Sequence, residues 1–296
     1  MRFRKIFPLL SLFLALCLLA AAGVAVAQEN RTKKSDVVVD DTDGSWKADD
    51  GSPIVVELFT ATNCSACMPA DRILYDIAKM PNVIALGCHI NYWDEHTLGD
   101  PTGLEECTYR QWAYRSSGMF GGTNIKVPHF MINGVYSVDS GKTRLFYNRL
   151  MQAKEADRKP AQVFMEWVDD DSLRIHMPAA NRKIGDNDSF SVWLIRYQDY
   201  MIQKVDTGQT AGRVLRFTNV VKNAKHIAKW HGKVRVIEVD VDKPPGGAER
   251  GGYVTIIHQI NGSEVVAAGK VPDYKTEEAK NSDDADRETL KGPLFE

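Results

Sequence analysis

The chain has 296 residues, of which 44% are hydrophobic and 26% are charged. These fractions are ordinary for a globular protein, and they exclude a wholly disordered chain, a collagen-like chain and a protein with many membrane spans. Lys and Arg number 37 against 39 Asp and Glu, which gives a net charge of −2. Because no basic excess is available to bind a phosphate backbone, nucleic acid is not an expected partner. The length suits about two domains.

Residues 1–27 have the pattern of a cleavable secretory signal peptide. Three basic residues precede an apolar run that ends in Ala25-Val26-Ala27. The run is long enough to cross a bilayer, so an uncleaved anchor is the alternative, but the small residues at its end favour cleavage. We therefore expect a periplasmic or secreted protein without membrane attachment after cleavage. Cys17 is lost with the signal, and the even number of remaining cysteines favours disulfide pairs.

Strand and helix signals alternate after a polar segment, residues 28–52, that is predicted to be a flexible linker. The expected elements are, in chain order, a strand over 54–59, a helix over 64–80 with Asn63 as a possible N-cap, a strand over 83–90, a helix over 103–118, a hairpin of strands 130–132 and 135–138 around Asn133-Gly134, and a helix over 142–157. This order predicts parallel strands first and an antiparallel hairpin last. Pro160 marks the expected boundary of this region.

The next region, residues 160–272, has a different pattern, with short strand signals separated by turn residues. The expected strands cover 162–168, 172–177, 190–197, 213–221, 233–240, 252–260 and 264–270. One helical turn or more near 222–230 is the alternative to a continuous β pattern there. Many short strands without clear helices favour an antiparallel sandwich or barrel. Residues 273–296 are acidic and poor in apolar residues, so a disordered tail is predicted, with an acidic docking tail as the alternative.

The sharpest chemical signal is Cys64-Ser65-Ala66-Cys67, placed between the first strand and the first helix. Two cysteines at this spacing can bond to each other, and the partial positive charge of a helix N-terminus favours a thiolate. Cys64 is then the nucleophile that forms a mixed disulfide, and Cys67 is the cysteine that resolves it. A zinc half-site and a static disulfide are the alternatives, and no familiar pattern supplies two further zinc ligands.

Two more residues extend this pattern into a resemblance to the thioredoxin superfamily. Pro128 directly precedes the strand over 129–132, where the superfamily has a cis proline that lies against the cysteine pair. Glu57 lies within an apolar strand, where thioredoxins have a buried carboxylate that accepts a proton from the resolving thiol. The resemblance therefore implies a catalytic set of Cys64, Cys67, Pro128 and Glu57. The alternative for Glu57 is an edge residue that reaches solvent.

Further segments match one family more closely. They are 56–60, 64–71, His89 with Tyr92-Trp93-Asp94, Arg110-Gln111 with Tyr114, and then 192–197, 208–213 and 219–221. Together they resemble the secreted thioredoxin-like family known as domain of unknown function 1223, over roughly residues 54–271. The resemblance implies an α/β thioredoxin-like domain over 53–159, followed by a mostly antiparallel β-sandwich-like domain over 160–272. The family has no settled activity, so the resemblance implies fold and export more than function.

Two cysteines depart from the family's pattern. Cys88 and Cys107 stand where the family generally has bulky apolar residues. Their joint presence suggests a structural disulfide, and closing a loop of about 20 residues would stabilise the fold by about 3 kcal/mol. A relay of electrons to Cys64 and Cys67, or a pair of free thiols, is the alternative.

Two histidines flank the predicted site. His89, Trp93 and Asp94 follow the second strand, and they are expected to form either a substrate or metal site with the thiols or a hydrogen-bonded loop with Trp93 as a lid. His129, next to Pro128, is expected either to affect the charge of the thiolate or to face solvent.

These observations predict a periplasmic or secreted thiol–disulfide oxidoreductase that needs no cofactor and no bound metal. The expected partners are protein thiols and disulfides, or a redox partner protein. The β-rich region shows no catalytic constellation, and Gly208 to Arg213 are expected to form a turn into a strand. The alternative is a non-catalytic binding protein on the same fold, either a copper carrier that uses the thiols and a nearby His or a partner-binding module.

Overall fold

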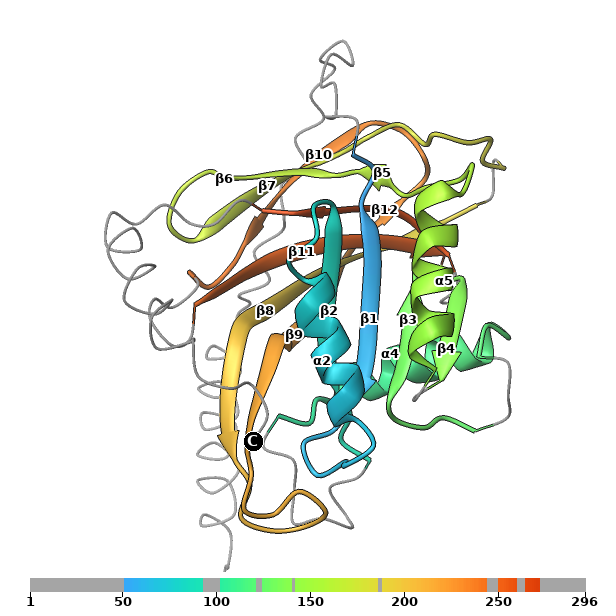
Figure 1. Cartoon of the computed structure of the whole chain (residues 1–296). Coiled ribbons are helices and arrows are strands. Elements are labelled where there is room, and N and C mark those ends of the chain that lie inside the picture. Colours follow the sequence, from blue (N-terminus) through green and yellow to red (C-terminus); the bar gives the residue numbers. More distant parts are fainter. Residues whose placement is uncertain are drawn as a thin grey trace, which may run out of the picture. The chain divides into compact units, whose positions relative to one another are not determined.

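The computed structural model describes residues 51–92, 102–120, 124–139, 142–185, 188–243, 250–259 and 264–271 (Figure 1). All of them belong to one compact unit within 37–296. The predicted signal peptide over 1–27 and tail over 273–296 lie outside the described residues, as does the linker up to residue 50. In the described part of the chain, no helix is both long enough and apolar enough to cross a membrane.

The first half of the described chain contains the elements that the sequence predicts. They are β1 (Ile54–Thr60), α2 (Met68–Ile77), β2 (Val83–His89), α4 (Glu105–Ser116), β3 (His129–Ile132), β4 (Tyr136–Asp139) and α5 (Thr143–Glu155). Strand β1 pairs in parallel with β2 and antiparallel with β3, which pairs antiparallel with β4. Asn133 and Gly134 join β3 to β4 with φ angles of 49° and 67°, the left-handed conformation that an Asn-Gly turn adopts readily.

Helix α2 starts later than the sequence predicts. Its N-cap is Cys67 rather than Asn63, because residues 64–67 form a turn in which the Cys67 N–H donates to the Cys64 carbonyl at 3.0 Å. Pro69 then lies in the first helical turn, where its missing N–H breaks no helical hydrogen bond. The cysteine pair therefore occupies the entry to the helix and not the helix itself.

The second half is almost entirely strand. Its elements are β5 (Ala161–Gln162), β6 (Phe164–Trp167), β7 (Ser172–Met177), β8 (Phe190–Lys204), β9 (Val214–Trp230), β10 (Arg235–Asp240), β11 (Gly251–Gln259) and β12 (Val265–Lys270). Strands β8 and β9 form a long antiparallel hairpin from Phe190 to Trp230. The alternative of a helical turn near 222–230 is wrong, because those residues continue β9.

The predicted fold class, an α/β thioredoxin-like domain followed by a separate β-sandwich-like domain, is wrong. Strand β9 pairs in parallel with β2, so strands from both halves share one nine-stranded mixed sheet in the order β4-β3-β1-β2-β9-β8-β11-β12-β5. A second sheet has the order β10-β7-β6. The protein is therefore mostly β, with one large sheet that runs through both halves (Figure 1).

A glycine makes the junction of β2 and β9 possible. A Cβ atom on Gly87 would lie 2.9 Å from the Thr218 carbonyl oxygen, so a larger residue would force the two backbones apart. Asn219, with φ of 48°, donates from Nδ2 to the Ala85 carbonyl at 2.8 Å and fixes the same contact. The close approach of two backbones at Gly87 thus allows β2 and β9 to pair, and side chains from both halves pack in one apolar cluster.

Helices cover both faces of the strands of the first half. On one face, Val56 and Leu58 of β1 pack with Leu74 of α2 and Phe146 of α5. The opposite face belongs to the cluster that contains Tyr114 of α4. Figure 1 shows α2 and α5 in front of these strands and α4 behind them. The two faces of the sheet are thus assigned to different helices.

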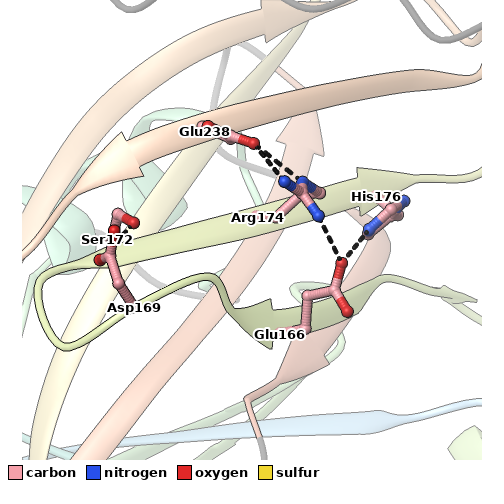
Figure 2. Close-up of polar contacts among 6 residues, drawn as sticks. All are labelled: Glu166, Asp169, Ser172, Arg174, His176 and Glu238. Carbon is pink, nitrogen blue, oxygen red and sulfur yellow. Dashed lines mark hydrogen bonds and ion pairs between the residues drawn. The ribbon is translucent and has the colours of Figure 1, made fainter.

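The small sheet packs through Leu173 and Ile175 on the second-half strands of the large sheet. Its other side carries a network of charges. There Arg174 donates to Glu238 at 2.6 and 2.9 Å and to Glu166 at 3.2 Å, while His176 Nε2 lies 3.1 Å from Glu166 (Figure 2). Arg174 and both glutamates are more than a third exposed, so each ion pair contributes at most about 1 kcal/mol. The network ties β6, β7 and β10 in register.

Candidate functional site

Cys64 and Cys67 form a disulfide in the turn between β1 and α2, with Cα atoms 5.2 Å apart. The side chains are 2% and 0% exposed, whereas Ser65 and Ala66 between them are exposed. The disulfide therefore lies beneath its own turn rather than on the surface.

A segment from the other half of the chain lies on this turn. It is the loop over residues 205–213 that joins β8 to β9, called the β8–β9 tip below. Gln209 Oε1 accepts hydrogen bonds from the Ser65 N–H and hydroxyl at 3.2 and 3.1 Å, and the buried Thr210 hydroxyl donates to the Thr62 carbonyl at 3.0 Å. Gly208 has φ of 85°, and a Cβ there would lie 2.7 Å from Asn63 Oδ1. The tip thus covers the residues that lead into Cys64.

His89 belongs to a buried polar chain beside the same turn. Its Nδ1 lies 2.6 Å from Thr102 Oγ1, which lies 3.3 Å from Thr62 Oγ1. The edge of the His89 ring packs on Phe217 of β9, with ring centroids 4.6 Å apart. This geometry matches the hydrogen-bonded alternative for His89. Trp93 and Asp94 lie outside the described residues, and within those residues no three His, Cys, Asp or Glu side chains gather to hold a metal ion.

Glu57 is buried and bound to α4. Arg110 Nε donates to Glu57 Oε1 at 2.7 Å, and the Tyr114 hydroxyl donates to Oε2. Burial disfavours the charged form of Arg110, but the Glu57 carboxylate outweighs it and the Arg110 pKa is raised. Burial, together with the Glu57 charge, raises the pKa of Tyr114 well above its usual value. The geometry favours an anchoring role for Glu57 over proton transfer, and the solvent-reaching alternative is wrong because Glu57 is 2% exposed.

The segment around Pro128 is also buried. The Val127–Pro128 peptide bond is cis. His129 is fully buried, with Nε2 2.7 Å from Ser137 Oγ and its ring stacked on Phe120 at 3.8 Å. Burial lowers the pKa of His129 to about 4, although the nearby Asp139 opposes that shift. His129 is thus neutral at pH 7, supplies no positive charge to a thiolate, and does not face solvent.

A model of the family described as proteins of unknown function, DUF1223, matches residues 55–258, which is more than half of the chain. The chain belongs to the DUF1223 family. A crystal structure of an Agrobacterium tumefaciens protein is similar to this DUF1223 chain, with a TM-score of 0.63 and 22% sequence identity over 77% of this chain and 98% of that one. At that identity the likeness shows the fold alone. No curated protein matches the chain.

This DUF1223 protein has a second disulfide, Cys88–Cys107, the bond that the joint presence of the two cysteines suggested. It joins β2 to the first turn of α4, over a sequence separation of 19. Both cysteines are buried, and they belong to the same apolar cluster as Cys64 and Cys67. The bond holds α4 against the sheet, next to the Glu57–Arg110 ion pair.

Gln209 and Thr210 contact the cysteine turn, whereas the sequence pattern predicted only a turn into a strand at their positions. Their neighbours Gly208 and Gly212 have φ of 85° and 81°, and the two glycines were a visible sign of a tight loop. Nothing local showed that this loop folds onto Ser65, 144 positions away. The anchor of the tip is an apolar cluster of Val205, Leu215, Phe217 and Val220 with Met68 packed against it.

Proposed function

We propose that the protein is a thiol–disulfide oxidoreductase whose redox pair is Cys64 and Cys67. The observation that carries the proposal is the place of this disulfide, in a single turn that leads directly into α2. The free N–H groups and partial positive charge of a helix N-terminus favour a thiolate once the bond is reduced. A bond with a sequence separation of 3 also stabilises the fold by only about 2 kcal/mol in the chain-entropy model, so chemistry is the better reason for it.

The proposal extends the thioredoxin resemblance to the neighbourhood of the pair. Strand β1, the cysteine turn and α2 follow one another as in that superfamily, and Pro128 precedes β3, the neighbour of β1. We infer a relationship to the superfamily for this neighbourhood, within a sheet that continues far beyond it.

The exchange transfers two electrons from the protein dithiol to the substrate disulfide. The Cys64 thiolate attacks one sulfur of a substrate disulfide, whose S–S bond breaks and releases a thiolate, and a mixed disulfide forms. The Cys67 thiolate then attacks the Cys64 sulfur, which releases the second substrate thiolate and leaves the Cys64–Cys67 disulfide. The protein dithiol is oxidised and the substrate is reduced. The reverse steps oxidise a substrate dithiol, and the reduction potential of the pair sets the direction.

The cysteine pair is covered, unlike the pair of an open redox site. The two sulfurs lie under the cysteine turn, and Gln209 and Thr210 hold the β8–β9 tip on it. We therefore include a displacement of the tip in the proposal, by a protein thiol or disulfide or by a redox partner that binds there.

We propose that the protein is exported and acts outside the cytoplasm. Disulfides persist in oxidising compartments, and the structure holds two of them. Together with the signal pattern of residues 1–27, they favour a periplasmic or secreted protein. Sequencing the N-terminus of the exported protein tests this part, and an N-terminus at Met1 would contradict it.

The reduction potential of the pair tests the function. We would equilibrate the protein in glutathione buffers, trap free thiols and quantify the Cys64–Cys67 bond in the wild type and in a Cys88→Ala/Cys107→Ala variant. A value between about −120 and −270 mV is the range of thiol oxidoreductases and is the expected result. A value well below about −300 mV marks a structural disulfide and overturns the proposal. A copper carrier would instead bind Cu(I) stoichiometrically and lose it in Cys64→Ser.

A further inference from the structure

A pocket of about 170 Å³ lies between α4 and the large sheet, and its surface is almost wholly apolar. It is lined by Tyr109, Arg110, Ala113, Tyr114, Trp193 and His258. These residues come from α4, β8 and β11, and none belongs to the cysteine turn or the β8–β9 tip. A binding site here is therefore independent of the redox pair and of the function proposed for it.

The polar side chains of the lining keep their polar ends out of the pocket. Arg110 donates to Glu57 from Nε and lies 3.4 Å from the Tyr114 hydroxyl through Nη2, and only 4% of Arg110 is exposed. Burial, with the nearby Arg110 charge, lowers the pKa of His258 to about 3, so its ring is neutral at pH 7. The walls thus offer carbon surface, and a charged ligand would lose its water there without gaining a partner.

Aromatic rings form much of the wall, and their neighbours hold them in place. The Trp193 ring lies 5.9 Å from the His226 ring at 73° and 6.1 Å from the His258 ring at 32°. On the opposite wall, the Tyr114 hydroxyl is bound to the buried carboxylate beneath α4. The Cys88–Cys107 bond also ties the first turn of α4 to β2. The pocket is therefore pre-formed, which lowers the entropy cost of binding a ligand.

The size and the entrance of the pocket indicate what it can hold. An apolar cavity of roughly 150 Å³ is known to bind benzene, so a pocket of about 170 Å³ has room for one ring with a methyl-sized substituent. Tyr109 at the rim is 65% exposed, and the pocket opens to solvent there. Aromatic walls make favourable edge and offset contacts with a further ring. We propose that this pocket binds a small uncharged apolar molecule built on one aromatic ring, of the size of toluene.

Two probes of similar shape test the proposal on the purified full chain by titration calorimetry. Toluene is uncharged, and benzoate carries a carboxylate in place of the methyl group. We expect toluene to bind saturably and benzoate to bind at least about tenfold more weakly, because the carboxylate would be desolvated without a partner. No saturable binding of toluene up to its solubility limit, or benzoate binding as tight as that of toluene, overturns the proposal.

One variant and one resonance place the binding in this pocket. Ala113→Leu adds a larger side chain to the lining and should weaken toluene binding at least about tenfold, because it takes up the space of the ligand. Ala156→Leu is the matched control and should leave binding unchanged, since Ala156 is also half-buried but follows α5, which packs on the opposite face of the sheet. In the wild type, the ring resonances of Trp193 should shift on addition of toluene. Undiminished toluene binding by Ala113→Leu contradicts the proposal, and unmoved Trp193 resonances do so even if that variant fails to fold.

Discussion

A single buried histidine, His129, makes the stability of the fold depend on pH. The pKa of His129 is lowered from 6.5 to about 4, first by burial and then by Lys126, against the pull of Asp139. The unfolded chain therefore takes up a proton near pH 6.5, whereas the folded chain does so only near pH 4. Stability that is present above pH 6.5 is lost as the pH falls through this window.

This residue yields the first prediction. As the pH falls from 7 to 5, the preference of unfolded His129 for the proton should lower the unfolding free energy by about 2 kcal/mol. The variant His129→Gln keeps a hydrogen-bond partner for Ser137 but does not titrate. It should therefore reduce the pH-dependent loss of stability by that amount. Urea unfolding at the two pH values measures it. The same substitution at His231, an exposed histidine, is the control. An equal loss in His129→Gln and wild type would show that His129 is not held neutral.

At the scale of an element, the β8–β9 tip lies on the cysteine turn and is held there by hydrogen bonds. Thr210 is buried, and its hydroxyl donates to the Thr62 carbonyl at 3.0 Å, while Gln209 accepts two hydrogen bonds from Ser65. A net hydrogen bond contributes about 1 kcal/mol, which is about a fivefold change in the opening equilibrium. Thr210→Val and Gln209→Ala should therefore each speed reduction of Cys64–Cys67 by dithiothreitol up to about fivefold.

Rapid-quench alkylation of the released thiols measures these rates. Gln203→Ala, on β8 beside the tip, provides the control, because Gln203 is half-buried and its side-chain amide donates to the adjacent Lys204 carbonyl rather than to the cysteine turn. If the wild type and both tip variants are reduced at one rate, the tip does not govern access, and the buried position of the sulfurs must be overcome in another way.

At the scale of the whole molecule, local signals predicted the elements and missed how they join. The Cys64–Cys67 spacing and the Asn133-Gly134 turn are written in neighbouring residues, so both were visible in the sequence. Glu57 stood out as an acid in an apolar strand, but its partner Arg110 lies 53 positions away and no periodicity points to it. The pairing of β9 with β2 likewise depends on a close backbone contact between Gly87 and Thr218, which are distant in the sequence.

That backbone contact supports a last prediction. Gly87→Ala would place a Cβ 2.9 Å from the Thr218 carbonyl oxygen, and because the obstacle is backbone, β9 must move away from β2. We expect the unfolding free energy to fall by about 1–3 kcal/mol, the usual effect of overpacking, within one cooperative transition, since a shared sheet couples both halves. Gly185→Ala is the matched control, since its nearest neighbour is a movable Asp188 carboxylate. Urea unfolding followed by both far-ultraviolet dichroism and tryptophan fluorescence tests the coupling. Two separate transitions in the wild type would mean that the β2–β9 junction does not unite the fold.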